Sequence, residues 1–339
     1  MFTPYRAEFE RRIRLAVIGC GGHSYRNVLP TLAYLPVDFV AACDLDPARA
    51  EEARRVFGAQ AAYSDHAEML RRERPDAVLV ITGYTEDGRC RYPILADEIL
   101  RAGAHVWVEK PPLNDLADVG LIRTAMAETG RIFAAGLKKM YFPVNQRLRR
   151  IVSDPSFGPV SSIVIRYPQY IPTIEEFAYR GTDRARWRAR VGFLDHICHP
   201  FSLLQLIGGP VETLSYVRER RGGGVATFTL RSGAIAVLHL AHGQSVTSPL
   251  ERIEVIGDGS NAVVENNIRL TWYRPAATRG LRQYGRDGDF TGDHGDAPLV
   301  WEPEFSLGSL ANKTTFLLGY HGELQAFCDA VLGGQAVPW

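Results

Sequence analysis

Residues 13–24 read IRLAVIGCGGHS, and this stretch decides the fold. The apolar run Ile13–Ile18, interrupted only by Arg14, predicts a buried strand. The segment GCGGHS at 19–24 follows at once and has the pattern G-x-G-x-x-S. A strand followed by a glycine-rich turn and a helix is the setting of a dinucleotide-binding loop.

In such a loop the first glycine allows the tight turn, and the second lets the backbone approach a pyrophosphate at the helix N-terminus. The third position, usually Gly or Ala, is Ser24 here. This change should loosen the packing of the helix on the strand more than it harms phosphate binding. The residues expected to line the cofactor are Gly19, Gly21, Gly22, His23 and Ser24.

A second predicted strand, Val37–Asp44, ends in an acid 25 positions after Gly19. A carboxylate there can accept hydrogen bonds from the adenosine ribose, and it repels the 2′-phosphate of NADP. The next residue is Leu45, where an arginine could have bound that phosphate. The pattern therefore favours NAD over NADP. The alternative is that Asp44 only caps the helix that begins near Pro47.

Strands and helices then alternate as far as Leu137, which indicates a doubly wound parallel sheet in an α/β fold. Residues 1–137 are therefore predicted to form an NAD-binding Rossmann domain. The expected helices are 47–57, 66–73, 93–102 and 115–128, and the further expected strands are 77–81, 105–108 and 131–137.

After Leu137 come one predicted helix at 144–152 and then long alternating strands, which predict a mostly antiparallel open sheet with one apolar face. Residues 138–339 are predicted to form an α+β domain for substrate binding and for assembly into a homodimer or homotetramer. The irregular segment 274–311 is a substrate cover, an oligomer contact or surface padding. The expected strands are 160–167, 213–218, 225–230, 234–241 and 252–256, with turns at 231–233 and 257–260 and a last helix at 321–332.

The apolar run His105–Val108 is followed by the sequence EKPP at 109–112. Proline cannot donate to a sheet and favours an extended residue before it, so the strand should stop at Lys110, at the edge where open parallel sheets bind ligands. Only four of the 39 basic residues are lysines, so a lysine at this edge is unusual. Its compact ammonium suits proton and hydride chemistry, although a solvated cation at a strand end is the alternative.

A predicted helix over 192–206 begins GFLDHICHP and places Asp195 and His199 four residues apart on one face. A carboxylate beside an imidazole raises its basicity and fixes its orientation, as a general base near neutral pH requires. The alternative is an N-cap or first-turn acid at Asp195 and a structural histidine at His199. A metal site formed by His196, Cys198 and His199 is the weakest interpretation, because neighbouring positions on one helix do not converge on one ion and no fourth ligand is evident.

Composition excludes several classes of function. A net charge of +1 gives no basic field for nucleic acid or for an anionic membrane. No apolar run reaches about 18 residues, and residues 1–14 lack the apolar segment of a signal peptide. The five cysteines are scattered and odd in number, which favours free thiols in a reducing cytoplasm. We therefore expect a cytoplasmic protein with two domains.

Three features stand in one order along the chain: the glycine loop at 19–24, Glu109-Lys110-Pro111, and Asp195-x-x-x-His199. With GYHGELQAF at 319–327, they resemble the glucose-fructose oxidoreductase / inositol dehydrogenase (Gfo/Idh/MocA) family over nearly the whole chain. The resemblance implies a Rossmann domain, a second domain with a large open sheet, and an NAD(P)-dependent dehydrogenase of sugars, cyclitols or their derivatives.

The resemblance also implies roles for single residues. Lys110 would hydrogen-bond the reacting oxygen and help to place the nicotinamide, with Glu109 and Thr82 beside the cofactor. His199 would take the hydroxyl proton as general base, and Asp195 would hold a substrate hydroxyl or the histidine. No metal is expected.

Several positions depart from the family pattern. Ile197 stands where a glycine is common, and Ser202 where an acid is common. Thr82-Gly83-Tyr84 replaces Thr-Pro-Asn, and Lys138-Lys139 stands where Asn and Arg are common. Because these positions are expected near the nicotinamide and the substrate, the identity of the substrate does not carry over.

Two other activities fit the same scaffold. In one, NAD stays bound and transient oxidation activates a glycoside for elimination or hydrolysis, so that no net NADH forms. In the other, the protein is a non-enzymatic sensor of NAD or sugar. A sensor has no need of Lys110, Asp195 and His199, and their presence in the sequence favours an enzyme.

Overall fold

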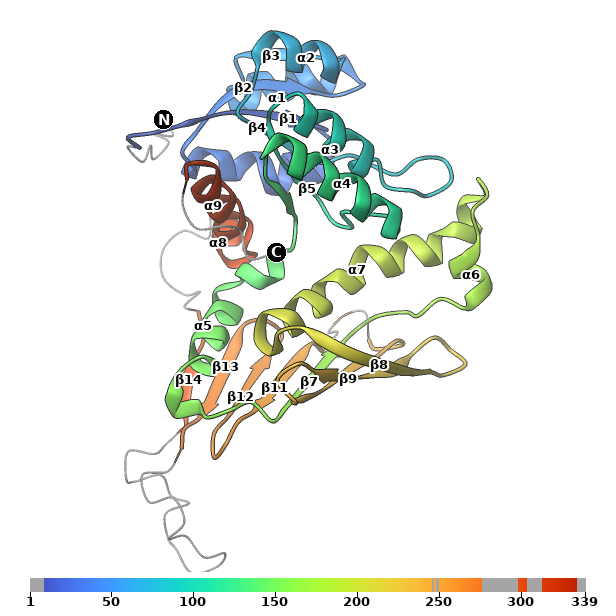
Figure 1. Cartoon of the computed structure of the whole chain (residues 1–339), viewed down its shortest axis with the longest axis vertical. Helices are drawn as coiled ribbons and strands as arrows, with labels where there is room; N and C mark the ends of the chain where they lie inside the picture. Colours follow the sequence, from blue (N-terminus) through green and yellow to red (C-terminus); the bar gives the residue numbers. More distant parts are fainter. Residues whose placement is uncertain (1–8, 246, 248–249, 276–297, 304–312, 334–339) are drawn as a thin grey trace, which may run out of the picture. The chain divides into compact units, whose positions relative to one another are not determined.

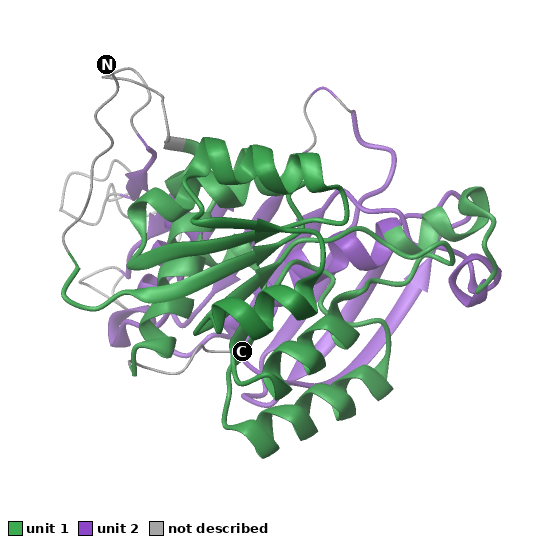
Figure 2. Ribbon diagram, turned by 90° about the horizontal axis from the view of Figure 1, so that it is seen from above, with its two compact units in different colours: residues 1–141, 180–191, 311–339 green, residues 142–179, 192–310 purple. Residues whose placement is uncertain are grey.

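The computed structural model describes residues 9–245, 247, 250–275, 298–303 and 313–333 (Figure 1). Packing divides the chain into two compact units (Figure 2). Unit 1 holds residues 1–141, 180–191 and 311–339, and unit 2 holds residues 142–179 and 192–310. The sequence-based boundary at 137/138 stays a prediction. The packing adds two later segments to unit 1, one of which contains the last helix.

The sheet of unit 1 has six parallel strands in the order β3-β2-β1-β4-β5-β6. This is the strand order of a Rossmann fold, and its topological switch point lies between β1 and β4. The prediction of a doubly wound parallel sheet is confirmed, and only the short β3 was missed. The strands are β1 (Ile13–Ile18), β2 (Val37–Cys43), β3 (Ala61–Tyr63), β4 (Ala77–Val80), β5 (His105–Val108) and β6 (Phe133–Ala135).

Two helices of unit 1, α1 and α4, start and stop at capping residues. The carboxylates of Asp46 and Asp115 accept backbone N–H groups of the first turns of α1 and α4, and Gly58 and Gly130 end these helices with positive φ. The helices are α1 (Pro47–Phe57), α2 (His66–Glu73), α3 (Tyr92–Arg101), α4 (Leu116–Thr129), α8 (Lys313–Leu317) and α9 (Tyr320–Val331).

The segment after the glycine loop is not a regular α-helix. It consists of a π-helical turn, η1 (Ser24–Val28), and a 3₁₀ segment, η2 (Leu29–Tyr34). Pro30 lacks the N–H that an α-helical ladder needs there, and Ser24 is completely buried. The departure from α-geometry begins at the residue that replaces the usual small third position of the fingerprint.

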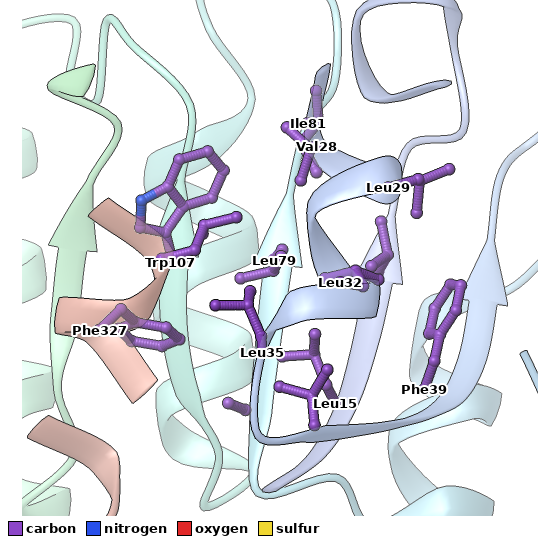
Figure 3. Packing of buried hydrophobic residues seen from close by; sticks show 14 of the residues in the cluster. Leu15, Val28, Leu29, Leu32, Leu35, Phe39, Leu79, Ile81, Trp107 and Phe327 are labelled. Atoms are coloured by element: carbon purple, nitrogen blue, oxygen red, sulfur yellow. The ribbon is translucent and has the colours of Figure 1, made fainter. Parts of the chain in front are cut away.

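Both faces of this sheet are covered, which explains the unbroken apolar sequences of its strands. Leu15 and Val17 of β1 face one core cluster, and Ala16 and Ile18 face the other. Phe327 of α9 packs in the first cluster, near Trp107 of β5 (Figure 3). The last helix is therefore part of the Rossmann core.

Unit 2 is built on an eight-stranded sheet in the order β14-β13-β12-β11-β7-β10-β9-β8. Every neighbouring pair is antiparallel except β7 and β10. The predicted mostly antiparallel sheet is confirmed, although β12, β13 and β14 were not predicted. The strands are β7 (Ser162–Tyr167), β8 (Val211–Arg218), β9 (Gly224–Leu230), β10 (Ile235–Leu240), β11 (Arg252–Ile256), β12 (Asn261–Glu265), β13 (Arg269–Tyr273) and β14 (Leu299–Trp301).

Helices cover one face of this sheet. Ile163 and Ile165 of β7 pack against the helical residues Leu148 and Leu204, whereas Val164 between them is exposed. β14 lies within the irregular segment 274–311, most of which is outside the described residues, so its predicted role stays open. The helices are α5 (Pro143–Val152), α6 (Ile174–Ala178) and α7 (Arg184–Gly208), with short 3₁₀ turns η3 (Lys138–Tyr141) in unit 1 and η4 (Pro155–Phe157) in unit 2.

Helix α7 begins eight positions before the predicted start. Asp183 precedes it, and its Oδ1 accepts the Ala185 N–H at 2.9 Å, as an N-cap does. Asp195 therefore lies inside the helix, and the alternative that it caps the helix is wrong. Among the described residues, no helix is long and apolar enough to cross a membrane.

Candidate active site

The first glycine of the loop is required by a backbone contact. Gly19 has φ +96°, and a Cβ atom there would lie 2.0 Å from the carbonyl oxygen of Ile81, at the end of β4. No atom lies within 4 Å of a Cβ at Gly21, and a Cβ at Gly22 would meet only the end of the Arg26 side chain, at 4.0 Å. The loop is therefore closed on the sheet side and open on the other, as a phosphate cradle needs.

Asp44 follows β2 and is tied to this loop. Its Oδ2 accepts the N–H of Cys20 at 2.8 Å, and its Oδ1 accepts the N–H of Asp46 at 2.9 Å. The N-cap of α1 is Asp46, whose carboxylate accepts the Ala48 N–H at 3.0 Å. The alternative that Asp44 serves only as the cap is therefore wrong. Its carboxylate lies beside the glycine loop, where a ribose would be bound.

These residues line one cleft of about 580 Å³ in unit 1. Its wall includes Gly19, Gly21, Asp44 and Thr82, all predicted to bind the cofactor. The Thr82 hydroxyl is buried and has no hydrogen-bond partner among the described residues, so it can bind a polar ligand group. The open glycine amides, the carboxylate at the strand end and this hydroxyl fit a dinucleotide.

A larger hollow of about 830 Å³ lies at the opposite ends of the strands, where Arg71, Arg74, His105 and Arg131 line it. Helices α2, α3 and α4 end beside it, and their carbonyl ends carry partial negative charge that arginines balance. Neither the glycine loop nor Asp44 lines this hollow. We therefore assign the cofactor site to the smaller cleft.

The loop 82–91 after β4 forms much of the cleft wall and is held by the start of α7. The Trp187 indole Nε1–H donates to the Glu86 carbonyl at 2.9 Å. Gly88 has φ +74°, and a Cβ there would lie 2.7 Å from the Trp187 ring. Trp187 is buried, so this segment of α7 is part of the packing of unit 1.

Glu109 connects the glycine loop to the start of the EKPP segment. Its side chain is buried, and its Oε1 accepts the Nε2–H of His23 at 2.9 Å. Its Oε2 lies 3.0 Å from the backbone N of Lys110, which donates to it. His23 Nδ1 in turn lies 3.3 Å from the Asn27 amide. Both ring nitrogens of His23 are thus engaged, and Glu109 is a structural link rather than a free acid.

Lys110 is half-buried and follows β5 by two residues, as the sequence predicts. It lies within electrostatic range of Lys138, which also interacts with Lys139. Three of the four lysines in the chain therefore gather near the carboxyl ends of β5 and β6. The charge of Lys110 is part of a cationic cluster, which is consistent with a role at an oxygen that gains negative charge.

Asp195 and His199 lie one turn apart on α7, in unit 2. His199 is buried, with 5% of its surface exposed, and Asp195 is half-buried. Burial is the main cause that raises the pKa of Tyr167, and the charges of Glu251, Cys198 and Asp195 raise it further. Tyr167 at the end of β7 therefore faces the same turn of α7. This set of side chains is a polar patch within the second unit.

No group of three or more His, Cys, Asp or Glu side chains in the described part of the chain could hold a metal ion. His196 is exposed, and its Nδ1 lies 2.8 Å from the Gly192 carbonyl oxygen, one turn back on the same helix. All five cysteines are free. Burial raises the pKa of Cys20, Cys43, Cys90 and Cys328 to about 12.

Residues 13–137 match the family described as "Oxidoreductase family, NAD-binding Rossmann fold", GFO_IDH_MocA. The match covers the Rossmann part of the chain, and the chain resembles this family. The match confirms the predicted Gfo/Idh/MocA resemblance, the Rossmann fold, the oxidoreductase class and NAD as the type of cofactor. The preference for NAD over NADP and the roles of single residues stay predictions.

Two characterised members of this Gfo/Idh/MocA group are similar over different lengths. The chain is 27% identical over 206 residues to dTDP-3,4-didehydro-2,6-dideoxy-alpha-D-glucose 3-reductase of Streptomyces violaceoruber, over 60% of this chain and 56% of that protein. It is 24% identical over 301 residues to D-apiose dehydrogenase of Paraburkholderia graminis, over 86% of this chain and 75% of that protein. The chain thus spans less than two thirds of the reductase.

Among solved structures, a dehydrogenase from Chromobacterium violaceum has the same fold, with a TM-score of 0.74 at 22% identity. The alignment covers 95% of this chain and 88% of that chain. The fold of this chain, a Rossmann sheet and a second large sheet, is therefore shared with that structure over both units.

Sequence reasoning missed several residues around the Glu109 side chain. Lys138, Tyr320 and Glu323 come from segments far apart in the sequence, and all three belong to unit 1. Lys138 was noted only as a departure from the family pattern. The scarcity of lysine was the available signal, because a Lys-Lys pair is unusual in a chain that otherwise uses arginine.

Proposed function

We propose that the protein is an NAD-dependent dehydrogenase that oxidises a secondary alcohol of a sugar, a cyclitol or a sugar derivative, or reduces the corresponding ketone. The observation that carries this proposal is the cleft of unit 1. Its glycine loop is open, and Asp44 is fixed by two backbone N–H groups beside that loop. Lys110 follows β5, which pairs with β4 at the same edge of the sheet.

The bound nicotinamide would accept or supply the hydride. Lys110 would donate a hydrogen bond to the reacting oxygen, and its charge would favour alkoxide character in the transition state. His199 would act as general base for the hydroxyl proton, and Asp195 would orient the histidine or bind a neighbouring hydroxyl.

NAD is the proposed cofactor rather than NADP. Asp44 uses each oxygen for a backbone N–H, and each oxygen has further lone pairs for the ribose hydroxyls. A 2′-phosphate would be repelled by this carboxylate. Leu45 is exposed and offers no charge to compensate.

Sugars and their derivatives are proposed as substrates because both relatives named above act on sugar compounds by their names. A homo-oligomer is proposed because β8 exposes the apolar side chains Leu214, Tyr216 and Val217. A cytoplasmic location is proposed because five free cysteines suit a reducing compartment.

A screen for NADH formation tests the function. The protein is mixed with NAD and with aldoses, cyclitols, anhydrosugars and glycosides in turn, and the absorbance of NADH is followed. We expect net NADH with at least one free polyol. Cleavage of a glycoside without net NADH would contradict the proposal and would instead indicate a retained cofactor. Binding of NAD with no turnover of any compound would favour a sensor.

A further inference from the structure

Five side chains from four segments meet behind the glycine loop in unit 1. They are His23 of the loop, Glu109 after β5, Lys138 of η3, and Tyr320 and Glu323 of α9. The amino acid sequence separates them by up to 300 positions, from His23 to Glu323. Contacts join Glu109, His23, Tyr320 and Lys138 in that order, and the charges of Lys138 and Glu109 complete a circuit that links the last helix to the cofactor loop.

Two sides of the circuit are hydrogen bonds. His23 donates to Glu109 at 2.9 Å, and Lys138 Nζ donates to the Tyr320 hydroxyl at 2.9 Å. The Lys138 ammonium also lies 4.5 Å from the centre of the Tyr320 ring, within cation–π range. The Tyr320 and His23 rings contact each other edge to face, with centroids 6.1 Å apart. Tyr320 thus contacts both His23 and the half-buried Lys138.

Glu323 lies next to this circuit with no hydrogen bond of its own. Only 2% of its surface is exposed, and neither carboxyl oxygen has a hydrogen-bond partner among the described residues. The Leu137 amide, which donates to the Ala135 carbonyl at 2.9 Å, also lies close enough to Glu323 to lower the pKa of this carboxyl. A buried carboxylate without partners is very costly, whereas a buried neutral carboxylic acid is less so.

The charges around Glu323 favour the neutral acid. Burial is the main cause that raises its pKa well above 4.5, and the charge of Glu109 raises it further, against an opposing effect of Lys138. Burial also lowers the pKa of Lys138, which Glu109 opposes and Lys110 and Lys139 reinforce. Lys138 interacts with both carboxylates, Glu109 and Glu323. With Glu323 neutral, Lys138 is the counter-ion of Glu109.

We infer that Glu323 is a positioning residue that must carry its proton for NAD to bind tightly. The neutral acid does not attract the Lys138 ammonium, so the charge of Lys138 stabilises the Glu109 carboxylate, and Glu109 in turn holds His23 and the glycine loop in place. This inference rests on the proposed binding of NAD in unit 1. When Glu323 loses its proton, two buried carboxylates compete for one lysine. Glu109 then holds His23 less firmly, and the loop that binds the pyrophosphate loosens.

Other titratable groups surround Glu323 and must be separated from it in any test. Tyr34 of η2 and His321 of α9 are two of them, and their rings contact each other. The titratable groups on α9 and on the described elements near it include His23, Tyr34, Glu109, Lys110, Lys138, Lys139, Tyr141, Tyr320, His321, Cys328 and Asp329. A variant that removes only the proton of Glu323 is therefore needed.

Glu323→Gln supplies that variant, because glutamine keeps the shape of the acid and cannot ionise. The dissociation constant of NAD is measured by calorimetry between neutral pH and about pH 9.5 for both proteins. We expect the native protein to lose about tenfold in affinity over this range, equivalent to about 1.4 kcal/mol, and Glu323→Gln to lose less than about twofold. Asp329→Asn, an exposed acid on the same helix, is the matched control and should follow the native curve.

Infrared spectroscopy of the native protein gives a second measurement that needs no variant to fold. A protonated carboxyl band should be present at neutral pH and should disappear over the range in which NAD affinity falls. Parallel pH curves for the native protein and Glu323→Gln would overturn the inference, as would absence of the band at neutral pH. Failure of every sugar to be oxidised would contradict the proposed dehydrogenase activity but would leave these binding curves unaffected.

Discussion

Replacement of Asp44 by asparagine tests the assignment of the cofactor cleft. The carboxylate accepts two backbone N–H groups, at 2.8 and 2.9 Å, one on each oxygen. Asparagine has one acceptor oxygen, so its NH₂ group would face one of these donors. The backbone N–H left without an acceptor costs about 1–3 kcal/mol of folding free energy when buried, and about 1 kcal/mol at this half-buried site.

The effect on NAD should be larger than the effect on folding. A hydrogen bond from a ribose hydroxyl to a carboxylate contributes about 1.5–3 kcal/mol, so its loss weakens binding by about 10- to 150-fold. NADP should be affected in the opposite direction, because the repulsion of its 2′-phosphate is removed. We expect the preference for NAD over NADP to fall by at least about tenfold.

Calorimetric titration of Asp44→Asn with each dinucleotide measures both constants, and urea denaturation of the unliganded protein measures the folding cost separately. Asp46→Asn is the matched control. Asp46 lies two residues away and caps α1, where asparagine is as good a cap, and it does not line the cleft. An NAD affinity within about twofold of the native value in both variants would refute the assignment of the ribose to Asp44.

Three further results follow from the structure. Gly19→Ala should cost at least about 2 kcal/mol of stability in urea denaturation, because its Cβ would lie 2.0 Å from the Ile81 carbonyl oxygen. Gly21→Ala, with no atom within 4 Å of the new Cβ, should leave stability nearly unchanged but weaken NAD binding in titration, and an equal loss of stability in both would contradict this. Lys110→Met should lower turnover of an identified substrate by at least about 100-fold while NAD still binds, and turnover close to native would exclude Lys110 from the chemistry. Glu323→Gln should be more stable than the native protein above about pH 4.5, with a difference that grows as pH rises. The native protein loses stability over this range because the unfolded chain releases the proton of Glu323 while the folded state, in which the pKa is raised, retains it. Denaturation at pH 5 and pH 8 measures the difference in free energy of unfolding, and a constant difference would contradict this prediction.

The Rossmann unit was largely predictable from local sequence. The periodic alternation of apolar strands and capped helices needs no knowledge of distant residues, and β1, β2, β4 and β5 appear within a residue or so of their predicted bounds. β3 was missed because three residues carry no periodicity. The start of α7 was missed because its first turns are rich in arginine, although Asp183 was a readable N-cap.

The second sheet was harder to predict. β12 and β13 are five residues each and alternate with polar positions that also suit loops. Their pairing with β11 depends on tertiary contacts that no short window contains. The helix α9 was itself predicted, at 321–332, but its packing in the core of unit 1 was not, because core partners such as Trp107 are some 200 residues away in the sequence.

In the candidate site, the residues that directly follow the ends of the parallel strands could be predicted from local sequence. Gly19, Gly21, Asp44 and Thr82 line one cleft, whereas Gly22, His23 and Ser24 are not among its lining residues, and cofactor binding by all of them stays a prediction. The circuit around Glu109 could not be predicted, because it depends on which side chains the core brings together from β5, η3 and α9. The tie between Glu109 and His23 is an example, since the two residues are 86 positions apart.

The gathering of lysines has a practical consequence. In most proteins amine-reactive reagents label many surface sites, and the signal from one site is lost among the others. Here Lys110, Lys138 and Lys139 lie near one another, the last of them buried, and the sequence holds only one other lysine, Lys313. Peptide mapping after brief acylation, with and without NAD, would therefore report directly on the occupancy of this region, without any engineered label.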